Sequence, residues 1–327
     1  MTRLLSIHDL RTHYFTPIGV VKAVDGCSIS LSSGEALGVA GESGCGKSTM
    51  ARSILRLIHP PDRIVSGEIY FKGTNLLAMG EDEFRGIRWD KISIVFQQSM
   101  HALNPVLKIS EQIIEPLVVK HRINKTDAEK KASELLELVG ISSSRIKNYP
   151  HEFSGGMKQR ALIAMSLICD PEIVILDEPT TALDVVSQRT ILSLASDLQK
   201  KLGLSIIWIT HDLAILSEVC NKIAIMYAGK IVEIGNTFEI ILDPKHPYTM
   251  GLLSSFPSLD RIDKELESIP GATPDLINPP SGCRFHPRCS YKTDICEKAP
   301  PKTEKIPGRA GGFIQCHHWE DIENSVS

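Results

Sequence analysis

The sequence predicts an α/β fold built around a buried, mostly parallel sheet. Short apolar runs rich in β-branched residues alternate with helical stretches, which is the pattern of strands covered on both faces. A glycine-rich segment joins one of these runs to a helix, and such tight strand–loop–helix turns are a second indication of this fold class. The predicted strands are residues 35–40, 92–96, 172–177, 205–210 and 222–227.

Length and charge limit the classes of protein to be considered. The 327 residues suffice for one large domain or two modest ones. A net charge of -3 argues against a nucleic-acid binder, which normally carries a basic stripe. No apolar run approaches the length of a membrane span, and residues 1–15 lack the apolar core of a signal peptide. We therefore expect a cytosolic chain, whose membrane role would come from docking onto a membrane partner.

The chain departs from the strand–helix alternation in two places. Between residues 108 and 150 the strand-like runs stop. Within that block, 126–141 has the periodicity of an amphipathic helix, with Thr126 as N-cap and Glu129 at the capping-box position. We interpret the block as a helical insert. From Phe256 onward nine of the 19 prolines occur, so we expect a separate extension with too little apolar content for a core of its own.

The segment "GESGCGKS", residues 41–48, has the form of a phosphate-binding loop. It follows an apolar strand and opens a helix, which is the context that such loops require. Glycines let successive N–H groups converge on phosphate oxygens, Lys47 adds a cation, and the Ser48 hydroxyl can ligate Mg²⁺. The alternative is a glycine-rich turn that matches by chance. The candidate nucleotide-binding residues here are Gly41, Ser43, Gly44, Cys45, Gly46, Lys47, Ser48 and Thr49.

Two acidic residues follow the apolar run "IVIL" at 173–176. Asp177 would hold Mg²⁺, directly or through water, and Glu178 would orient and deprotonate an attacking water. The alternative interpretation makes this pair a helix N-cap after a core strand. The phosphate loop favours the first interpretation, because hydrolysis of a nucleotide needs both parts.

The segment "FSGGMKQR", residues 153–160, indicates a second anion site. Ser154, Gly155 and Gly156 begin a helix whose first N–H groups are available as donors. Because the chain already has one phosphate loop, this second site would serve a nucleotide held by another subunit. With these motifs in this order, residues from about 4 to 250 resemble the ATP-binding cassette (ABC) ATPases.

The resemblance implies roles for further residues. Gln97 in "VFQQ" is similar to the Q-loop glutamine, which contacts Mg²⁺ and links the site to the helical insert. Asp184 resembles the D-loop aspartate, and His211 resembles the switch histidine that holds the γ-phosphate and the attacking water. Tyr14 lies where the family carries an aromatic residue that stacks on adenine, with Phe15 as a rival. Gln97 and His211 thereby join the general base as predicted catalytic residues.

A single cassette without a membrane span resembles the separate ATPase subunit of a bacterial-type importer. Three segments, "FSGGMKQR", "FQQSMHALNP" and "DPKHPYT", together are similar to dipeptide and oligopeptide permease ATPases with methionine in the signature. The resemblance implies peptide import, with nickel or another small solute as the alternative cargo. A regulatory ATPase that is not engaged in transport is the rival class.

The resemblance also implies a domain plan. The expected fold is a phosphate-loop core with an antiparallel β subdomain, formed by residues 1–97 and 156–235. A helical insert, 98–155, ends in the signature motif, and a C-terminal extension occupies 236–327.

The same resemblance implies the partners and the location. Two cassettes would close head-to-tail on two ATP molecules. Members of this type usually pair with a second, related ATPase, so a heterodimer is favoured and a homodimer is the alternative. Two membrane-spanning permease subunits would be direct partners and an extracytoplasmic peptide-binding protein an indirect one. The expected location is the cytoplasmic face of the cell membrane.

Four of the eight cysteines lie in the C-terminal extension. Cys283, Cys289 and Cys296 have the spacing C-x₅-C-x₆-C, and nineteen residues separate the third from Cys316. Clustered cysteines in a reducing compartment favour a metal over disulfides.

The spacing of these cysteines leaves the identity of the metal open. Four thiolates suit tetrahedral zinc, and reduced, unligated thiols are a further alternative. The resemblance to cluster-bearing permease ATPases implies a [4Fe–4S] cluster that fixes the extension. Being far from the phosphate loop in sequence, the cluster is expected to take no part in catalysis. The histidines that could substitute in a mixed zinc site are His286, His317 and His318.

Overall fold

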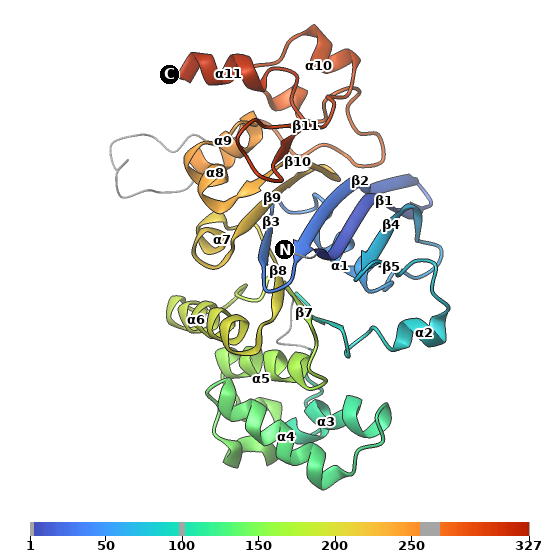
Figure 1. Ribbon diagram of the computed structural model, residues 1–327, viewed down its shortest axis with the longest axis vertical. Helices are drawn as coiled ribbons and strands as arrows, with labels where there is room; N and C mark the ends of the chain where they lie inside the picture. Colours follow the sequence, from blue (N-terminus) through green and yellow to red (C-terminus); the bar gives the residue numbers. More distant parts are fainter. Residues whose placement is uncertain (1–2, 98–101, 256–268, 327) are drawn as a thin grey trace. The chain divides into compact units, whose positions relative to one another are not determined.

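A computed structural model describes residues 3–97, 102–255 and 269–326. The chain divides into two compact units, of which one is Met1–Leu77 with Ile209–Ser327 and the other is Ala78–Trp208. Figure 1 colours the chain along its sequence and labels its helices and strands. Two parts of the sequence predictions lie outside the described residues, namely the first residues of the helical insert, 98–101, and the start of the proline-rich stretch, 256–268.

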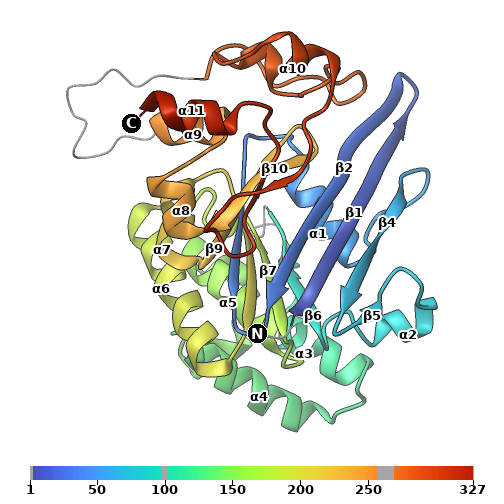
Figure 2. The same ribbon diagram turned by 45° about the horizontal axis from the view of Figure 1, so that its top comes forward.

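An antiparallel sheet near the N-terminus belongs to the first unit. Its strands follow the order β2-β1-β4-β5, and every neighbouring pair is antiparallel. In the second half of β2, Cys27, Ile29 and Leu31 are buried while the serines between them are less so, which is the two-residue period of a sheet with one covered face. The predicted antiparallel β subdomain is confirmed, and β1 and β2 run side by side in Figure 2. The strands are β1 (Arg3–Thr16), β2 (Gly19–Ser32), β4 (Arg63–Phe71) and β5 (Thr74–Asn75).

Further strands of the first unit carry the glycine-rich loop. They follow the order β11-β12-β10-β9-β3, with β3 parallel to β9 and the remaining pairs antiparallel. Every residue of β3 is buried, as expected of a strand covered on both faces. These strands are β3 (Ala36–Ala40), β9 (Lys222–Tyr227), β10 (Lys230–Asn236), β11 (Glu304–Lys305) and β12 (Phe313–Ile314). The helices of the unit are α1 (Lys47–Ile54), α7 (Leu213–Val219), α8 (Thr237–Leu242), α9 (Pro247–Ser254), α10 (Asp294–Lys298) and α11 (Trp319–Val326).

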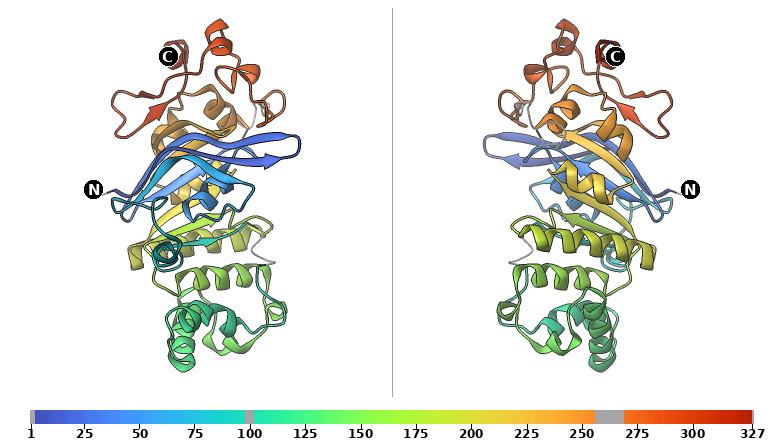
Figure 3. Two further views of the ribbon diagram at one scale, coloured as in Figure 1. Left: turned by 90° about the vertical axis from the view of Figure 1, so that its right-hand side faces the viewer. Right: turned by 90° about the vertical axis from the view of Figure 1, so that its left-hand side faces the viewer.

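The second unit combines parallel strands with a group of helices. β6 (Ile92–Val95) pairs in parallel with β7 (Ile173–Asp177), and β8 (Ser205–Thr210), most of which belongs to this unit, follows β7 in the strand order. The described residues between β6 and β7 contain helices and no strand, as predicted for the helical insert. Of these helices, α3, α4 and α5 contact one another; they are the green helices of Figure 3. The α-helices of the unit are α2 (Glu81–Arg85), α3 (Ile109–Val119), α4 (Lys125–Leu138), α5 (Gly155–Leu167) and α6 (Val185–Leu202).

Helix α4 begins earlier than predicted. Its N-cap is Asn124, whose side-chain oxygen accepts the Asp127 N–H at 3.0 Å. The prediction of Thr126 as N-cap is therefore wrong. Asparagine is the stronger N-cap residue, and a start at Lys125 adds residues to the helix at no cost in capping. Glu129 contacts Lys125 as an i,i+4 ion pair at 3.9 Å instead of completing a capping box.

The C-terminal extension has a small apolar cluster and is anchored to β10. Ile306, Ile314 and Trp319 form a small buried cluster, and the expectation that the extension has too little apolar content for a core of its own stays a prediction. Strand β12 pairs with β10. Arg309 lies 3.3 Å from the buried carboxylate of Glu233 on β10, so an ion pair joins the extension to the sheet. No helix among the described residues combines the length and apolar character needed to cross a bilayer.

Candidate nucleotide-binding site

The phosphate loop follows β3 and leads directly into α1. Gly46 is the N-cap of α1, in the left-handed region with φ 110°. A Cβ atom at Gly46 would lie 2.0 Å from the Ala23 carbonyl oxygen, and one at Gly41 would lie 2.0 Å from the Met226 carbonyl oxygen. Both positions therefore need glycine, because neighbouring backbone leaves no room for a side chain. The close packing shapes a cradle of backbone at the N-terminus of α1.

Lys47 directs its charge back onto this loop. Its side chain is buried, and Nζ donates to the carbonyl oxygens of Gly41 at 2.6 Å and Glu42 at 2.9 Å. Cys45 is also buried, and burial raises the pKa of its thiol, which agrees with a small packing residue. The Lys47 ammonium beside a glycine-rich helix N-terminus fits the phosphates of a nucleotide.

Tyr14 lies against the helix that follows the loop. Its hydroxyl is 3.1 Å from Thr49 Oγ1, so its orientation is tied to α1. The neighbouring Phe15 ring makes a cation–π contact with the Arg63 guanidinium, whose central carbon lies 4.5 Å from the ring centroid. The adenine-stacking role of Tyr14, with Phe15 as its rival, stays a prediction.

The acidic pair belongs to the second unit, at the end of β7. Asp177 is buried, and Glu178 adopts a left-handed backbone with φ 48°. Gln97 Nε2 donates to Glu178 Oε2 at 2.8 Å, and Thr181 Oγ1 donates to the same oxygen at 3.0 Å. The structure thus brings together the predicted base and the predicted Q-loop residue. The next helix, α6, is capped by Asp184, so the alternative that the acidic pair is a helix N-cap is wrong.

Two further predicted residues cap helices in this unit. Ser154 is the N-cap of α5 and accepts the Met157 N–H at 3.3 Å, as expected for the start of the signature helix. Asp184 accepts the N–H and the hydroxyl of Ser187 at 2.9 and 2.7 Å, and these hydrogen bonds lower the pKa of its carboxyl group. A Cβ at Gly156 would lie 2.9 Å from Ser187 Oγ, so the starts of α5 and α6 are close.

His211 belongs to the first unit, where it follows β8 and is exposed. The adjacent Asp212 caps α7 by accepting the Ala214 N–H at 2.8 Å, which fixes the turn that carries the histidine. The phosphate loop, Tyr14 and His211 thus lie in one unit. The predicted residues of the other unit are Gln97, Ser154, Gly155, Gly156, Asp177, Glu178 and Asp184.

Sequence reasoning missed two side chains at the phosphate loop. Tyr248 and Arg288 both contact Glu42, from 206 and 246 residues away. No local pattern links residues so far apart. The one signal was that Tyr248 belongs to the segment "DPKHPYT" and Arg288 lies between Cys283 and Cys289, both singled out above.

The four cysteines of the extension lie near one another. Cys296 is buried and the other three are partly buried. Burial raises the pKa of Cys316 to about 12, and the three other thiols contribute to this rise, because negative charges close together repel. Backbone joins two of the four directly, since the Cys283 N–H donates to the Cys296 carbonyl oxygen at 2.8 Å.

The spacing of these sulfur atoms bears on which metal they fit. A tetrahedral zinc with Zn–S bonds of about 2.3 Å holds its sulfur atoms about 3.8 Å apart. Within the described part of the chain, no three of the four cysteine sulfurs lie within 4.8 Å of one another. The sulfur atoms are thus not all at the spacing of a zinc site, and the identity of a metal at these cysteines stays a prediction.

The three histidines are each hydrogen-bonded to other groups. His286 Nδ1 lies 2.9 Å from the Cys283 carbonyl oxygen, His317 Nε2 2.9 Å from the Ala299 carbonyl oxygen, and His318 Nε2 2.6 Å from Thr293 Oγ1. Each therefore has one ring nitrogen hydrogen-bonded, which is also the usual state of a metal-ligating histidine, so the mixed zinc site stays an alternative.

Another cluster with metal-ligating atoms lies in the second unit. One ligand atom each from Asp90, His121 and Cys169 lies within 4.8 Å of the others. Lys120 Nζ is 2.8 Å from Asp90, and burial raises the pKa of the Cys169 thiol to about 11. A lysine thus already balances the carboxylate, and the thiol is protonated at neutral pH, so the cluster is satisfied without a cation.

Comparison with known proteins defines first the class and then the family. The family described as "ABC transporter" matches residues 24–181. The dimeric ATP-binding cassette MJ0796, solved in a post-hydrolysis state with ADP and phosphate, superposes with a TM-score of 0.64 at 28% identity, covering 71% of this chain and 98% of that one. The chain is an ABC-type ATPase.

The C-terminal part narrows the family further. Residues 232–296 match the family described as "Oligopeptide/dipeptide transporter, C-terminal region". The oligopeptide transport ATP-binding protein OppD of Bacillus subtilis is 48% identical over 92% of this chain and 86% of its own length. The dipeptide transport ATP-binding protein DppD of Caldanaerobacter subterraneus is 41% identical over 98% of both chains. The chain therefore belongs to the family of ATP-binding proteins of oligopeptide and dipeptide ABC transporters.

Proposed function

We propose that this chain is the ATP-hydrolysing subunit of an ABC importer for dipeptides or oligopeptides. The observation that carries the proposal is the match of residues 232–296 to the C-terminal region of oligopeptide and dipeptide transporters. Relatives named for oligopeptide and dipeptide transport support it along nearly the full chain. Import of nickel or another small solute, and a regulatory role outside transport, are the alternatives that the experiment below must exclude.

The proposed chemistry assigns a task to each site residue. Lys47 and the loop N–H groups bind the phosphates, and Mg²⁺, held by Ser48, Gln97 and Asp177, would neutralise charge that develops on them. Glu178 takes a proton from the attacking water, and Gln97 holds that carboxylate at 2.8 Å.

The remaining residues serve the γ-phosphate and a facing subunit. His211 would hold the γ-phosphate and the attacking water. In a head-to-tail dimer, the Ser154, Gly155 and Gly156 loop would bind the partner's nucleotide, with Asp184 beside it. ATP then favours the closed pair and hydrolysis releases it, which is a ligand-dependent two-state switch.

The proposed assembly places this subunit at the cytoplasmic face of the membrane. Its partners are two membrane-spanning permease subunits and a second, related ATPase, with an extracytoplasmic peptide-binding protein as an indirect partner. A homodimer is the alternative to the ATPase heterodimer. We further propose the predicted division into a core (1–97 and 156–235), a helical insert (98–155) and an extension (236–327), with the insert transmitting motion to the permease.

Co-purification and reconstitution test this proposal. The tagged chain, expressed with the permease genes beside its own, is expected to purify with two membrane subunits and a second ATPase. In proteoliposomes, ATP hydrolysis should rise when binding protein and a peptide are added, and nickel salts should leave it unchanged. Stimulation by nickel alone, or purification without any membrane subunit, would reject the peptide importer. A complex with this ATPase alone would replace the heterodimer with a homodimer.

We also propose that Cys283, Cys289, Cys296 and Cys316 hold a [4Fe–4S] cluster that fixes the extension. The all-thiol donor set, the proximity of the four thiols and their partial or full burial support it. Anaerobically purified protein should be brown and contain about four irons and four sulfides per chain. Each single Cys→Ser change should bleach it, whereas Cys169→Ser, outside the extension, should not. Colourless protein with one zinc and no sulfide would promote the zinc alternative.

A further inference from the structure

Glu42, the second residue of the phosphate loop, is held at three points. Its carbonyl oxygen accepts a hydrogen bond from Lys47 Nζ at 2.9 Å. Its backbone N–H donates to the Tyr248 hydroxyl at 2.9 Å. Its carboxylate receives two hydrogen bonds from Arg288, at 2.6 Å from Nη1 to Oε2 and 2.9 Å from Nη2 to Oε1. Two of these three partners come from the C-terminal part of the chain.

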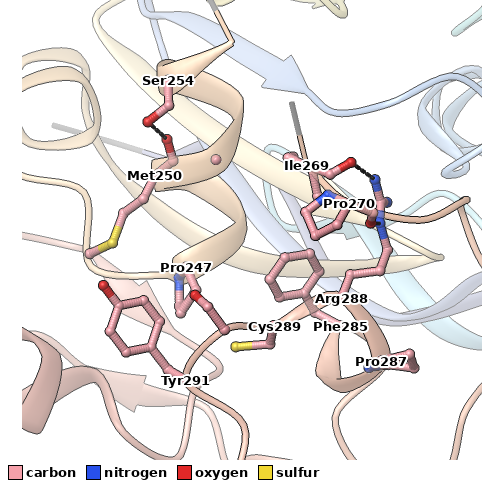
Figure 4. A pocket seen from close by; sticks show the side chains of 12 residues that line it. Pro247, Met250, Ser254, Ile269, Pro270, Phe285, Pro287, Arg288, Cys289 and Tyr291 are labelled. Carbon is pink, nitrogen blue, oxygen red and sulfur yellow. Dashed lines mark hydrogen bonds between the residues drawn. The ribbon is translucent and has the colours of Figure 1, made fainter. Parts of the chain in front are cut away.

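Arg288 is itself fixed in place. Its side chain is only 5% exposed, and its Nε donates to the Pro270 carbonyl oxygen at 2.7 Å. Arg288 is one of the residues that line a cavity of about 470 Å³. Its side chain extends from the segment of Cys289 toward Ile269 and Pro270 (Figure 4). A bidentate hydrogen-bonded ion pair between a buried guanidinium and a carboxylate fixes both the position and the plane of the carboxylate. Glu42 therefore has little freedom to rotate.

Tyr248 presents its hydroxyl from a rigid aromatic group. The residue is completely buried, and its ring centroid lies 4.5 Å from that of Tyr227 and 5.4 Å from that of Phe285. Phe285 belongs to the same cysteine-bearing segment as Arg288. The extension thus supports the phosphate loop through one packed cluster and two polar contacts.

We propose that Arg288 and Tyr248 are positioning residues for ATP hydrolysis, which hold Glu42 so that the phosphate loop keeps its nucleotide-binding shape. Gly41, Gly44 and Gly46 all have positive φ, so the loop backbone is permissive and gains from an external support. A loop fixed before binding loses less entropy when it closes on phosphates. The proposal concerns ATP alone and depends neither on the transported solute nor on a metal at the cysteines.

The test uses ATP affinity as its readout, on the full chain. Arg288→Met removes the guanidinium and keeps an apolar stem. We expect the KM for ATP and the Kd for the fluorescent analogue TNP-ATP to rise about tenfold, with a smaller change in kcat. Tyr248→Phe removes one hydroxyl, and about a threefold rise is expected. Combining Glu42→Gln with Arg288→Met should cost little more than the larger single change, since both act through one contact.

Arg284→Met is the matched control. Arg284 is a buried arginine of the same segment, but it binds Asp25 and the Ala228 carbonyl oxygen, which lie outside the phosphate loop. Its loss should lower the thermal unfolding midpoint comparably and leave KM within about twofold. The proposal is overturned if Arg284→Met raises KM as much as Arg288→Met does, or if Arg288→Met leaves KM and Kd unchanged. Should Arg288→Met fail to fold, an unchanged KM in Tyr248→Phe overturns it.

Discussion

Replacing Glu178 by glutamine isolates the role of one negative charge. Glutamine has nearly the same size and keeps an oxygen that can accept from Gln97 Nε2 and Thr181 Oγ1, now at 2.8 and 3.0 Å. Each hydrogen bond to a charged acceptor is stronger than its neutral counterpart by about 1 kcal/mol, so the folded state loses at most about 2 kcal/mol. The left-handed backbone at this position imposes the same strain on either residue.

The chemical step should respond far more strongly than stability. A positioned general base contributes about 10²–10⁴-fold, which corresponds to about 3–5 kcal/mol of activation free energy. We expect single-turnover hydrolysis to fall about a thousandfold while the Kd for ATP stays within about twofold. Because ATP then persists, the variant should remain a closed dimer in size-exclusion chromatography with ATP.

A milder variant serves as the control for Glu178. Thr181→Val removes one hydrogen bond and leaves the carboxylate, so hydrolysis should fall no more than about tenfold. Glu178→Gln with more than about a tenth of wild-type turnover would refute the assignment of this residue as general base. An equal loss in both variants would instead point to positioning of the loop.

Two further predictions concern stability. Arg309→Met leaves the fully buried Glu233 carboxylate without its cation, so urea denaturation should show that the free energy of unfolding falls by about 3–5 kcal/mol. Adding Glu233→Gln should restore part of this stability, because the buried charge is then removed as well. A fall below about 1 kcal/mol would contradict a stabilising ion pair. Burial lowers the pKa of His246 to about 3, so the unfolded chain takes up a proton that the folded chain refuses as pH falls below about 6.5. Between pH 7.5 and 5.0, the free energy of unfolding should therefore decrease by about 2 kcal/mol more in the wild type than in His246→Asn. Asparagine can still cap α9 but does not titrate. Parallel curves of stability against pH for the two proteins would reject this account.

The local sequence was sufficient to predict an element wherever the residues that cause it lie within the same short segment. The strands at 205–210 and 222–227 have the predicted bounds, because continuous apolar runs between polar turns leave one register. The phosphate loop and the signature helix were predictable for the same reason, since glycines and an N-cap serine act on backbone within a few residues. The start of α4 was predicted wrongly because two candidate N-cap residues, Asn124 and Thr126, lie two positions apart. The capping-box pattern favoured Thr126, whereas the stronger cap, Asn124, begins the helix.

By itself, the sequence determined the class of this protein: a phosphate loop, an acidic pair after a strand and a signature helix in order define an ABC ATPase. Only the tertiary structure revealed that the C-terminal part of the chain contacts the phosphate loop. Arg288 and Tyr248 reach Glu42 only because β9, α9 and the cysteine segment pack together, closing chain separations of 246 and 206 residues. Contacts at such separations arise from burial of many side chains at once, and no local pattern carries them.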